Sequence, residues 1–348
     1  MKNPVPQTLK GIFVPTIAPY NEGGRINEDE LRRIVDWLID RGVSGLYPNG
    51  SLGEFIRLSF EERKEVVRII CEQTDGRVPI LAGAAEPNLE LTLEMCHYCS
   101  ELGCRAVSIT GPYYYKTSQE GIEEYFREVA RHSPIDIIVY NIPMFANEVS
   151  VPVLQRLARD CPAIIGTKDS SKDLCRFMHV EHEIKSERRD FVNLIGWEEL
   201  LVPSMMMGGD GGTLSTAGVA PEVMMKIYDT ARSGQWAEAI RMQYRIMDLF
   251  NAMIQAPNFP EGFRSGYAIR GFDVGHARFP LSEQESERSA QIRNEIACLL
   301  AEFGFPEAAS VCKRSQSIEK WKTGSRVISR EHISHIVRDV FRQYQDGD

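Results

Sequence analysis

The chain has no apolar run that approaches the roughly 20 residues needed to cross a lipid bilayer. Residues 1–11 also lack the apolar stretch that a secretory signal requires. We therefore expect neither a membrane segment nor a secretory leader, and we expect a cytoplasmic protein.

An excess of positive charge is missing as well. The 348 residues carry 40 Lys and Arg against 49 Asp and Glu, a formal net charge of −9, and the two signs are interspersed. A nucleic-acid-binding protein usually has a basic stripe, so we expect no nucleic-acid partner. A small anionic substrate is still compatible with this balance, because one local positive site suffices to bind an anion.

Metal-binding patterns are scarce although the chain has eight cysteines. Cys96 and Cys99 form a CxxC pair, but the pair lies in a helical stretch and has no second pair nearby, as a zinc site usually would. His179 and His182 fit an exposed helix face better than a ligand set. We expect no bound metal, and without a leader segment we expect reduced thiols.

What the sequence does contain is eight short apolar runs rich in β-branched residues, each followed by an amphipathic stretch. The runs are continuous rather than alternating, as in parallel strands that are covered on both faces. The predicted strands are Gly11–Ile17, Val43–Pro48, Pro79–Gly83, Ala106–Thr110, Asp136–Asn141, Ala163–Lys168, Val192–Gly196 and Gly211–Ser215.

The stretches between these runs have the periodicity of helices. Residues 31–39, for example, place their apolar side chains on one helical face. Asn27 with Glu30, and Ser59 with Glu62, have the spacing of capping boxes at the starts of the first two helices. Later predicted helices are Glu120–His132, Val151–Arg159 and Pro221–Arg232.

Eight strand–helix units predict an α/β fold of the (β/α)8 TIM-barrel type. An open doubly wound sheet is the alternative, but it would need a glycine fingerprint after the first strand, and Pro15–Pro19 is not one. After residue 232 the pattern contains helices alone, with Pro306–Ser325 as a looser connection. We therefore predict a barrel over residues 1–232 and a C-terminal helical region, packed on it, over residues 233–348. The helices predicted there are Gln235–Ile254, Glu283–Phe303 and Glu331–Gln345.

Active sites of such barrels lie at the C-terminal ends of the strands, and one strand end carries a lysine. Lys168 ends a strongly apolar strand, where burial would disfavour the ammonium form and lower the amine pKa. A neutral amine is the form that attacks a carbonyl group. The alternative is a structural ion pair between Lys168 and Asp169 at the barrel rim.

Two other strand ends carry groups suited to the same chemistry. Tyr140 ends the preceding strand, where its hydroxyl could carry protons to and from an imine; it could equally be an aromatic plug. The loop that begins Gly50-Ser51 could hold a carboxylate with its backbone N–H groups and a hydroxyl. A second glycine-rich loop, Gly208–Gly212, offers a phosphate site near the last two strands as an alternative.

Four stretches together resemble the dihydrodipicolinate synthase and N-acetylneuraminate lyase family of pyruvate aldolases. The resemblance extends over residues 8–305, and the stretches occur in the family's order and spacing. They are Gly50-Ser51-Leu52-Gly53-Glu54, Pro112-Tyr113-Tyr114-Tyr115-Lys116, Tyr140-Asn141-Ile142-Pro143 and Gly166-Thr167-Lys168-Asp169-Ser170-Ser171.

The resemblance implies roles for individual residues. Lys168 would form a Schiff base with a 2-oxo acid, so that no separate cofactor is needed. Tyr140 would transfer protons and stabilise the carbinolamine, and Gly50 and Ser51 would belong to the carboxylate-binding loop. Tyr114 looks like the tyrosine that reaches into the neighbouring subunit's site, which implies a homo-oligomer built as a dimer of dimers.

Two departures from the family pattern concern the substrate. Leu52 replaces the second hydroxyl of the carboxylate loop and removes one donor. Phe145 stands where dihydrodipicolinate synthases usually carry an Arg for the carboxylate of the aldehyde substrate, and an apolar ring cannot replace that clamp. We therefore rank the condensation of pyruvate with aspartate semialdehyde, the 4-hydroxy-tetrahydrodipicolinate synthase reaction, second.

The stretch that contains Gly196, Glu198 and Glu199 is similar to the neuraminate lyases, whose acidic groups bind sugar hydroxyls. Ser215 falls on a hydroxyl position of that subgroup. Ser170 and Thr213 complete the predicted substrate-binding set. Glu198 and Glu199 could otherwise merely cap the next helix.

The resemblance thus implies a lyase that cleaves or forms a 2-keto-3-deoxy sugar acid or a sialic-acid-like compound from pyruvate and an aldehyde. A sugar-acid dehydratase that uses the same lysine is a further alternative. Two other classes stay open: a barrel enzyme that binds phosphate at Gly208–Gly212 without a covalent intermediate, and an inactive sensor of 2-oxo acids.

Overall fold

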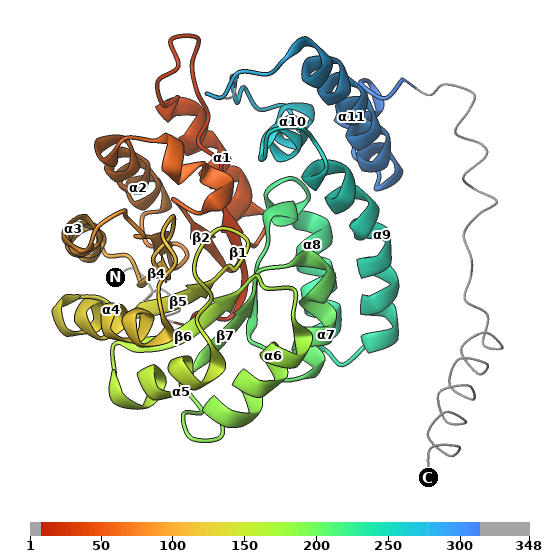
Figure 1. Cartoon of the computed structure of the whole chain (residues 1–348). Helices are drawn as coiled ribbons and strands as arrows, with labels where there is room; N and C mark the ends of the chain where they lie inside the picture. The colour runs from red at the N-terminus through yellow and green to blue at the C-terminus, as the bar shows by residue number, and fades with distance from the viewer. Residues whose placement is uncertain (1–7, 277, 314–348) are drawn as a thin grey trace. The chain divides into compact units, whose positions relative to one another are not determined.

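Eight parallel strands form the centre of the molecule in the computed structural model, which describes residues 8–276 and 278–313 (Figure 1). The strand order is β2-β1-β8-β7-β6-β5-β4-β3, and a parallel bridge between Leu46 and Ile80 joins the two ends. The predicted TIM barrel is therefore confirmed, and all eight predicted strands are present. They are β1 (Gly11–Pro15), β2 (Gly45–Tyr47), β3 (Leu81–Gly83), β4 (Ala106–Thr110), β5 (Ile137–Asn141), β6 (Ile164–Asp169), β7 (Val192–Ile195) and β8 (Gly211–Thr213).

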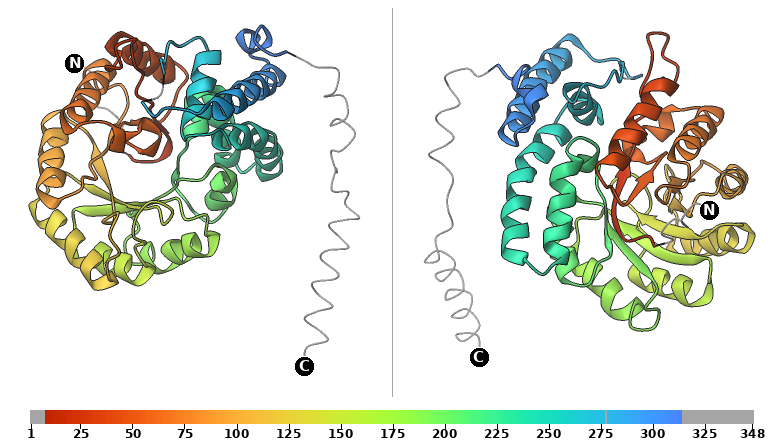
Figure 2. Two further views of the ribbon diagram at one scale, coloured as in Figure 1. Left: turned by 45° about the horizontal axis from the view of Figure 1, so that its top comes forward. Right: turned by 180° about the vertical axis from the view of Figure 1, so that it is seen from behind.

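A ring of helices surrounds the strands, as Figure 2 shows in two further views. The barrel strands are buried because helices cover their outer face while side chains fill the interior. The helices are α1 (Glu28–Asp40), α2 (Phe60–Thr74), α3 (Leu89–Glu101), α4 (Gln119–His132), α5 (Val151–Asp160), α6 (Leu174–His179), α7 (Leu201–Met206) and α8 (Pro221–Arg232).

The two predicted capping boxes have different outcomes. Ser59 and Glu62 form the reciprocal box at the start of α2. Asn27 caps α1 by accepting a hydrogen bond from the Glu30 backbone N–H at 3.3 Å. The Glu30 carboxylate, however, pairs with Arg33 and accepts from the Asp273 backbone N–H. The second half of that prediction is wrong, because a neighbouring side chain of the same helix and a distant backbone N–H compete for the Glu30 carboxylate.

Buried apolar side chains from most of the strands form a core cluster. Phe13, Tyr47, Leu81 and Leu194 belong to it. Each fully buried apolar side chain of this size contributes about 1.5–3 kcal/mol. Where β1 and β8 meet, a Cβ at Gly211 would lie 2.1 Å from the Gly11 carbonyl oxygen, so the close approach of these strands requires glycine.

The C-terminal helices belong to the same compact unit as the barrel, Met1–Val311. In α9, Gln243 accepts a hydrogen bond from the Val202 backbone N–H at 2.7 Å and donates to the Glu199 carbonyl oxygen at 2.7 Å, which ties this helix to the β7–α7 segment. The predicted boundary at residue 232 stays a prediction, and the predicted helix 331–345 lies outside the described residues. The helices are α9 (Trp236–Ile254), α10 (Glu261–Ile269), α11 (Glu283–Glu302) and α12 (Pro306–Ala309), the last at the start of the predicted loose connection.

Cysteine oxidation departs from expectation at two positions. Cys96 and Cys99 are buried and free in α3, whereas Cys298 and Cys312 are disulfide-bonded. The prediction of reduced thiols is wrong for these two, because it came from the lack of a leader segment and not from distances between sulfur atoms. Across residues 8–276 and 278–313, no helix combines the length and apolarity needed to span a membrane.

Candidate active site

The side chain of Lys168 is enclosed at the C-terminal end of β6, with 3% of the residue exposed. Its Nζ lies 3.9 Å from the ring centroid of Tyr140 and 4.3 Å from that of Tyr47. Burial lowers the Lys168 pKa well below its ordinary value, and the charge of Glu198 opposes this only in part. The neutral amine, which is the nucleophilic form, is therefore accessible at lower pH than for an exposed lysine.

Asp169, the next residue, faces away from Lys168 because successive strand residues point to opposite sides. Its carboxylate pairs with Arg176 at 2.6 Å and accepts a hydrogen bond from Asn141 at 3.0 Å. The alternative in which Lys168 forms a structural ion pair with Asp169 is therefore wrong. The Lys168 side chain lines the cavity instead.

Tyr140 is paired with Lys168 in the β5–β6 ladder. Burial raises the pKa of its phenol, while hydrogen bonds with Ser170 and Ser51 act in the opposite direction. The Ser170 hydroxyl lies 3.5 Å from the Tyr140 oxygen and donates to the Gly196 carbonyl at 3.1 Å. A protonated phenol beside an amine and two hydroxyls is suited to passing a proton to a reacting oxygen.

The space beside Lys168 is so narrow that residue 196 has to be a glycine. A Cβ at this position would lie 2.1 Å from the Ser170 oxygen and 3.1 Å from Cε of Lys168. Any side chain here would displace Ser170, the lysine or both. Glycine therefore keeps the base of the site open.

A cavity of about 460 Å³ opens from Lys168 toward solvent. It brings together most of the residues predicted from sequence, although they come from five strand ends and the loops that follow them. The predicted residues among its lining are Ser51, Leu52, Tyr140, Phe145, Lys168, Ser170, Gly196, Glu198, Glu199, Thr213 and Ser215.

Gly50 and Tyr114 are the two predicted residues that do not line this cavity. Gly50 precedes the short 3-10 helix η1 (Ser51–Gly53), and its missing Cβ lets the loop pass Tyr47, whose ring would otherwise be 2.9 Å away. Tyr114 is 89% exposed with φ 75°, and its ring packs on Tyr115. Within the chain, Tyr114 instead lines a neighbouring cavity of about 680 Å³ that shares Ser51 and Phe145 with the first.

The two acidic residues have specific partners near the cavity. Glu198 is buried and accepts from the Thr216 N–H and hydroxyl at 3.0 and 3.3 Å, and burial raises its pKa. Glu199 accepts from the indole N–H of Trp197 at 2.8 Å. The interpretation that both merely cap the next helix is therefore wrong, since their carboxylates hold side chains and loops of the cavity wall.

Sequence reasoning missed several residues of the site. Tyr47 ends β2, and its ring contacts both the Lys168 amine and the edge of Tyr140; its place at a strand end was the available signal. Lys172 lines the cavity with no comparable signal in the sequence. Part of the wall comes from the C-terminal helices and the turn between them, which no strand pattern could indicate: Phe250, Asn251, Ile254, Phe259 and Phe263.

The Gly208–Gly212 loop lies at the other end of the barrel. It leads into β8, and Asp210 bonds to Gly11 at the start of β1 and to Asn193 near the start of β7. The Asp210 carboxylate is neutralised by Lys10 and Lys185. The prediction of a phosphate site on this loop next to the chemistry is therefore wrong, because the loop precedes its strand.

The chain matches the Dihydrodipicolinate synthetase family over residues 8–298. It is 30% identical to an uncharacterised DapA-like lyase of Thermofilum pendens over 292 residues, 82% of this chain and 97% of the relative. It is 32% identical to the 4-hydroxy-tetrahydrodipicolinate synthase of Bartonella bacilliformis over 274 residues, 78% of this chain and 92% of the relative.

A crystal structure with the same fold is that of a prophage protein of the dihydrodipicolinic acid synthase family from E. coli K12, solved in complex with pyruvate. The TM-score is 0.79 at 26% identity, over 84% of this chain and 99% of that one. The chain therefore belongs to the dihydrodipicolinate synthetase family of class I aldolases and lyases.

Proposed function

We propose that Lys168 forms a Schiff base with pyruvate, and that the enzyme cleaves or forms a 2-keto-3-deoxy sugar acid or a sialic-acid-like compound. The observation that carries this proposal is the amine of Lys168, buried at the base of the cavity between the rings of Tyr140 and Tyr47. The pyruvate in the E. coli relative supports the choice of 2-oxo acid.

The chemistry begins with attack of the neutral Lys168 amine on C2 of the 2-oxo acid. Tyr140 passes the proton that leaves nitrogen to the carbonyl oxygen, giving a carbinolamine, and the oxygen departs as water when the iminium forms. In cleavage, the C3–C4 bond electrons move to the iminium nitrogen while the C4 hydroxyl loses its proton and becomes an aldehyde. The enamine is then protonated at C3 and hydrolysed to free pyruvate. The covalent imine takes the place of a separate cofactor.

The carboxylate of the 2-oxo acid fits the loop at Ser51. The backbone N–H groups of Gly53 and Glu54 are used within the loop, where they donate to the Gly50 and Ser51 carbonyls. We assign the carboxylate to the hydroxyl and N–H of Ser51 and the N–H of Leu52, since both residues line the cavity. Leu52 supplies no hydroxyl, so we assign the proton relay to Tyr140, Ser170 and Ser51.

The remote part of the substrate would lie against the polar wall. Glu198, Glu199 and Ser215 offer acceptors for sugar hydroxyls. The buried hydroxyl of Thr213 has no partner within the described residues, so it too is available to a ligand. Phe145, 57% exposed, offers an apolar surface where an arginine clamp would be needed for a second carboxylate.

Two alternatives within the family use the same lysine. The name of the Bartonella relative favours condensation of pyruvate with aspartate semialdehyde. Dehydration of a 3-deoxy sugar acid would also start from the imine. Turnover of a panel of aldehydes and sugar acids distinguishes the three, and efficient use of aspartate semialdehyde alone would overturn our choice.

We also propose a homo-oligomer, built as a dimer of dimers, in which Tyr114 reaches the site of a neighbouring subunit. Its exposure and its left-handed backbone support this assignment. The adjoining cavity is largely apolar in its lining and includes Ile56, 68% exposed, and Tyr115, 78% exposed. Such a surface is typical of a protein–protein contact.

The decisive experiment is borohydride reduction in the presence of pyruvate, followed by peptide mass spectrometry. A pyruvate-sized adduct on Lys168 would support the covalent mechanism. A folded protein that gives no adduct with excess pyruvate, or an adduct on another lysine, would contradict it and favour a noncovalent enzyme or a sensor.

A further inference from the structure

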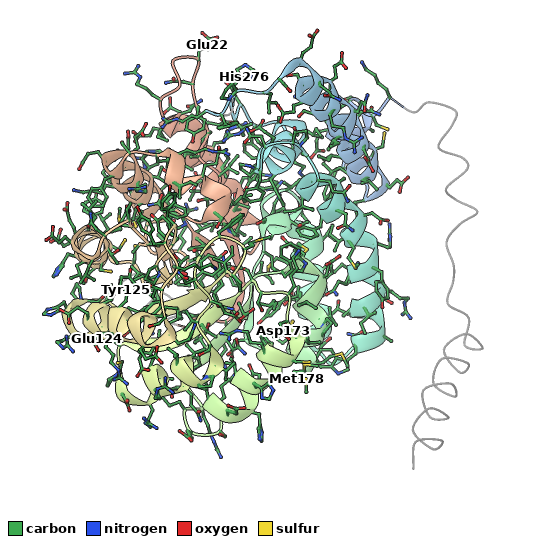
Figure 3. The ribbon with its side chains drawn as sticks, viewed as in Figure 1. Glu22, Glu124, Tyr125, Asp173, Met178 and His276 are labelled. Atoms are coloured by element: carbon green, nitrogen blue, oxygen red, sulfur yellow. The ribbon has the colours of Figure 1, made fainter. Side chains whose placement is uncertain are left out.

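Lys172 lies at the active-site cavity in a backbone conformation that disfavours its side chain. Its φ is 67°, in the left-handed region where a residue with a Cβ is strained. The residue lies in the short loop after β6, the strand that carries Lys168, and Asp173, labelled in Figure 3, then caps α6. Strain of this kind is typically kept where a side chain has a function.

The ammonium group of Lys172 is held in place by an aromatic platform. Its Nζ lies 3.8 Å from the ring centroid of Trp197. The indole is fixed in turn by the Glu199 carboxylate on its N–H at 2.8 Å and by the edge of Phe250, with ring centroids 5.3 Å apart. A cation held over a fixed ring is positioned before any ligand arrives.

Trp197 positions the charge of Lys172 but does not neutralise it. In the part of the chain that the structure describes, no carboxylate forms an ion pair with Lys172. Among the described residues that line the cavity, Lys168 and Lys172 are the two that are lysine or arginine, and Lys172 is exposed whereas Lys168 is buried. The cavity thus has a buried amine at its base and an exposed, unpaired cation on its wall.

We propose that Lys172 binds an anionic group, a carboxylate or a phosphate ester, at the end of the substrate remote from the imine. This inference rests on the proposed function and names the subclass of sugar acid that the site selects. The hydroxyls of the substrate lie toward Glu198 and Glu199, and its terminal anion lies toward Lys172. The Glu198 carboxylate already accepts hydrogen bonds from Thr216, and the Glu199 carboxylate accepts one from Trp197, which leaves Lys172 as the exposed charge on this wall.

The test uses three 2-keto-3-deoxy six-carbon acids that end in a hydroxymethyl group, a carboxylate or a phosphate ester. Each is trapped on the full-length enzyme with borohydride, and the concentration that gives half-maximal adduct on Lys168 is measured. We expect an anionic terminus to lower this concentration by about 10- to 100-fold relative to the hydroxymethyl compound, as a charge-assisted contact would. Whichever of the carboxylate and the phosphate ester gives half-maximal adduct at the lower concentration is the anion that the site prefers.

Lys172→Met should abolish this preference, so that the three acids give half-maximal adduct at similar concentrations. Lys172→Arg should retain the preference. Lys226→Met, at an exposed lysine that lines a different cavity, is the matched control and should behave as the wild type.

Equal trapping of all three acids by the wild type would overturn the assignment of Lys172, as would equal weakening of all three by Lys172→Met. Failure of pyruvate to form an adduct is a different result. Pyruvate has no remote group, so that outcome would count against the imine on Lys168 and not specifically against the anion contact.

Discussion

Tyr140 and Lys168 face each other across the β5–β6 ladder, with the amine 3.9 Å from the centroid of the phenol ring. The ladder fixes both Cα positions, so the pair is held by backbone hydrogen bonds and not by a flexible loop. Tyr140→Phe should keep this packing and remove the proton carrier. We expect kcat to fall by about 100- to 10,000-fold, with slower formation of the pyruvate adduct.

Tyr47→Phe is the control for that substitution. Its hydroxyl lies 3.3 Å from the Ser108 hydroxyl, and its ring is what contacts the lysine. The loss of kcat should therefore be much smaller than for Tyr140→Phe. Equal losses in the two variants would argue against Tyr140 as the proton carrier.

Lys168→Arg should reduce activity by about 1,000-fold or more, because a guanidinium cannot form an imine. Charge is conserved in this variant, so a noncovalent enzyme that needs only a cation would retain substantial activity. Retro-aldol turnover and the borohydride adduct are measured together. Retained turnover without an adduct would contradict the covalent mechanism.

The buried amine also predicts a dependence of stability on pH. The Lys168 pKa is depressed in the folded protein, whereas the unfolded chain keeps this amine protonated below about pH 10.4. Between the two pKa values the unfolded state binds more protons, so burying Lys168 costs stability there and the cost shrinks as pH rises. Lys168→Met should therefore raise the free energy of unfolding most near neutral pH. Denaturant titrations of both proteins across this range test the trend, and a gain that grows with pH would contradict it.

Gly196→Ala should disable the site without unfolding the barrel. The new methyl group would lie 2.1 Å from the Ser170 oxygen and 3.1 Å from Cε of Lys168. We expect loss of the pyruvate adduct, with a change in stability of about 1–3 kcal/mol from overpacking. Gly23→Ala, where the methyl would meet only the Asn21 side chain at 3.3 Å, is the control. Normal adduct formation by Gly196→Ala would show that the base of the site is more adaptable than its geometry indicates.

Lys172→Gly should raise the stability of the protein and remove its preference for an anionic substrate. Glycine tolerates the φ of 67° without a Cβ penalty, so we expect the free energy of unfolding to rise by about 1 kcal/mol. The preference for an anionic terminus should be lost at the same time. A variant that is less stable than the wild type would mean that the contact with Trp197 outweighs the backbone strain.

The strands and the reacting pair could be predicted because they leave strong local signals. Eight apolar runs with helical intervals specify a barrel, and a lysine at the end of one of them is conspicuous. Glu30 shows the limit of such signals, since Asn27 and Glu30 have capping-box spacing while Arg33 and Asp273 compete for the Glu30 carboxylate. Competition from other partners cannot be inferred from spacing.

The sequence also could not predict at which end of the barrel a loop lies or which distant segments contribute to the site. Gly208–Gly212 has the composition of an anion-binding loop, but it precedes β8 and so lies at the end of the barrel away from Lys168. Lys172 is an ordinary residue in sequence, and only its φ and its contact with Trp197 distinguish it. Both features depend on three-dimensional placement, which neither composition nor periodicity encodes.

One part of the cavity wall is formed by α9, α10 and the turn between them, whereas the reacting lysine lies on β6. Phe250, Phe259 and Phe263 line the cavity from a part of the sequence that does not contain the reacting amine. Mutational drift in this segment can therefore change which aldehyde is accepted while leaving bond-making chemistry intact. The amine and the surface opposite it can thus change independently, because they come from different stretches of the chain.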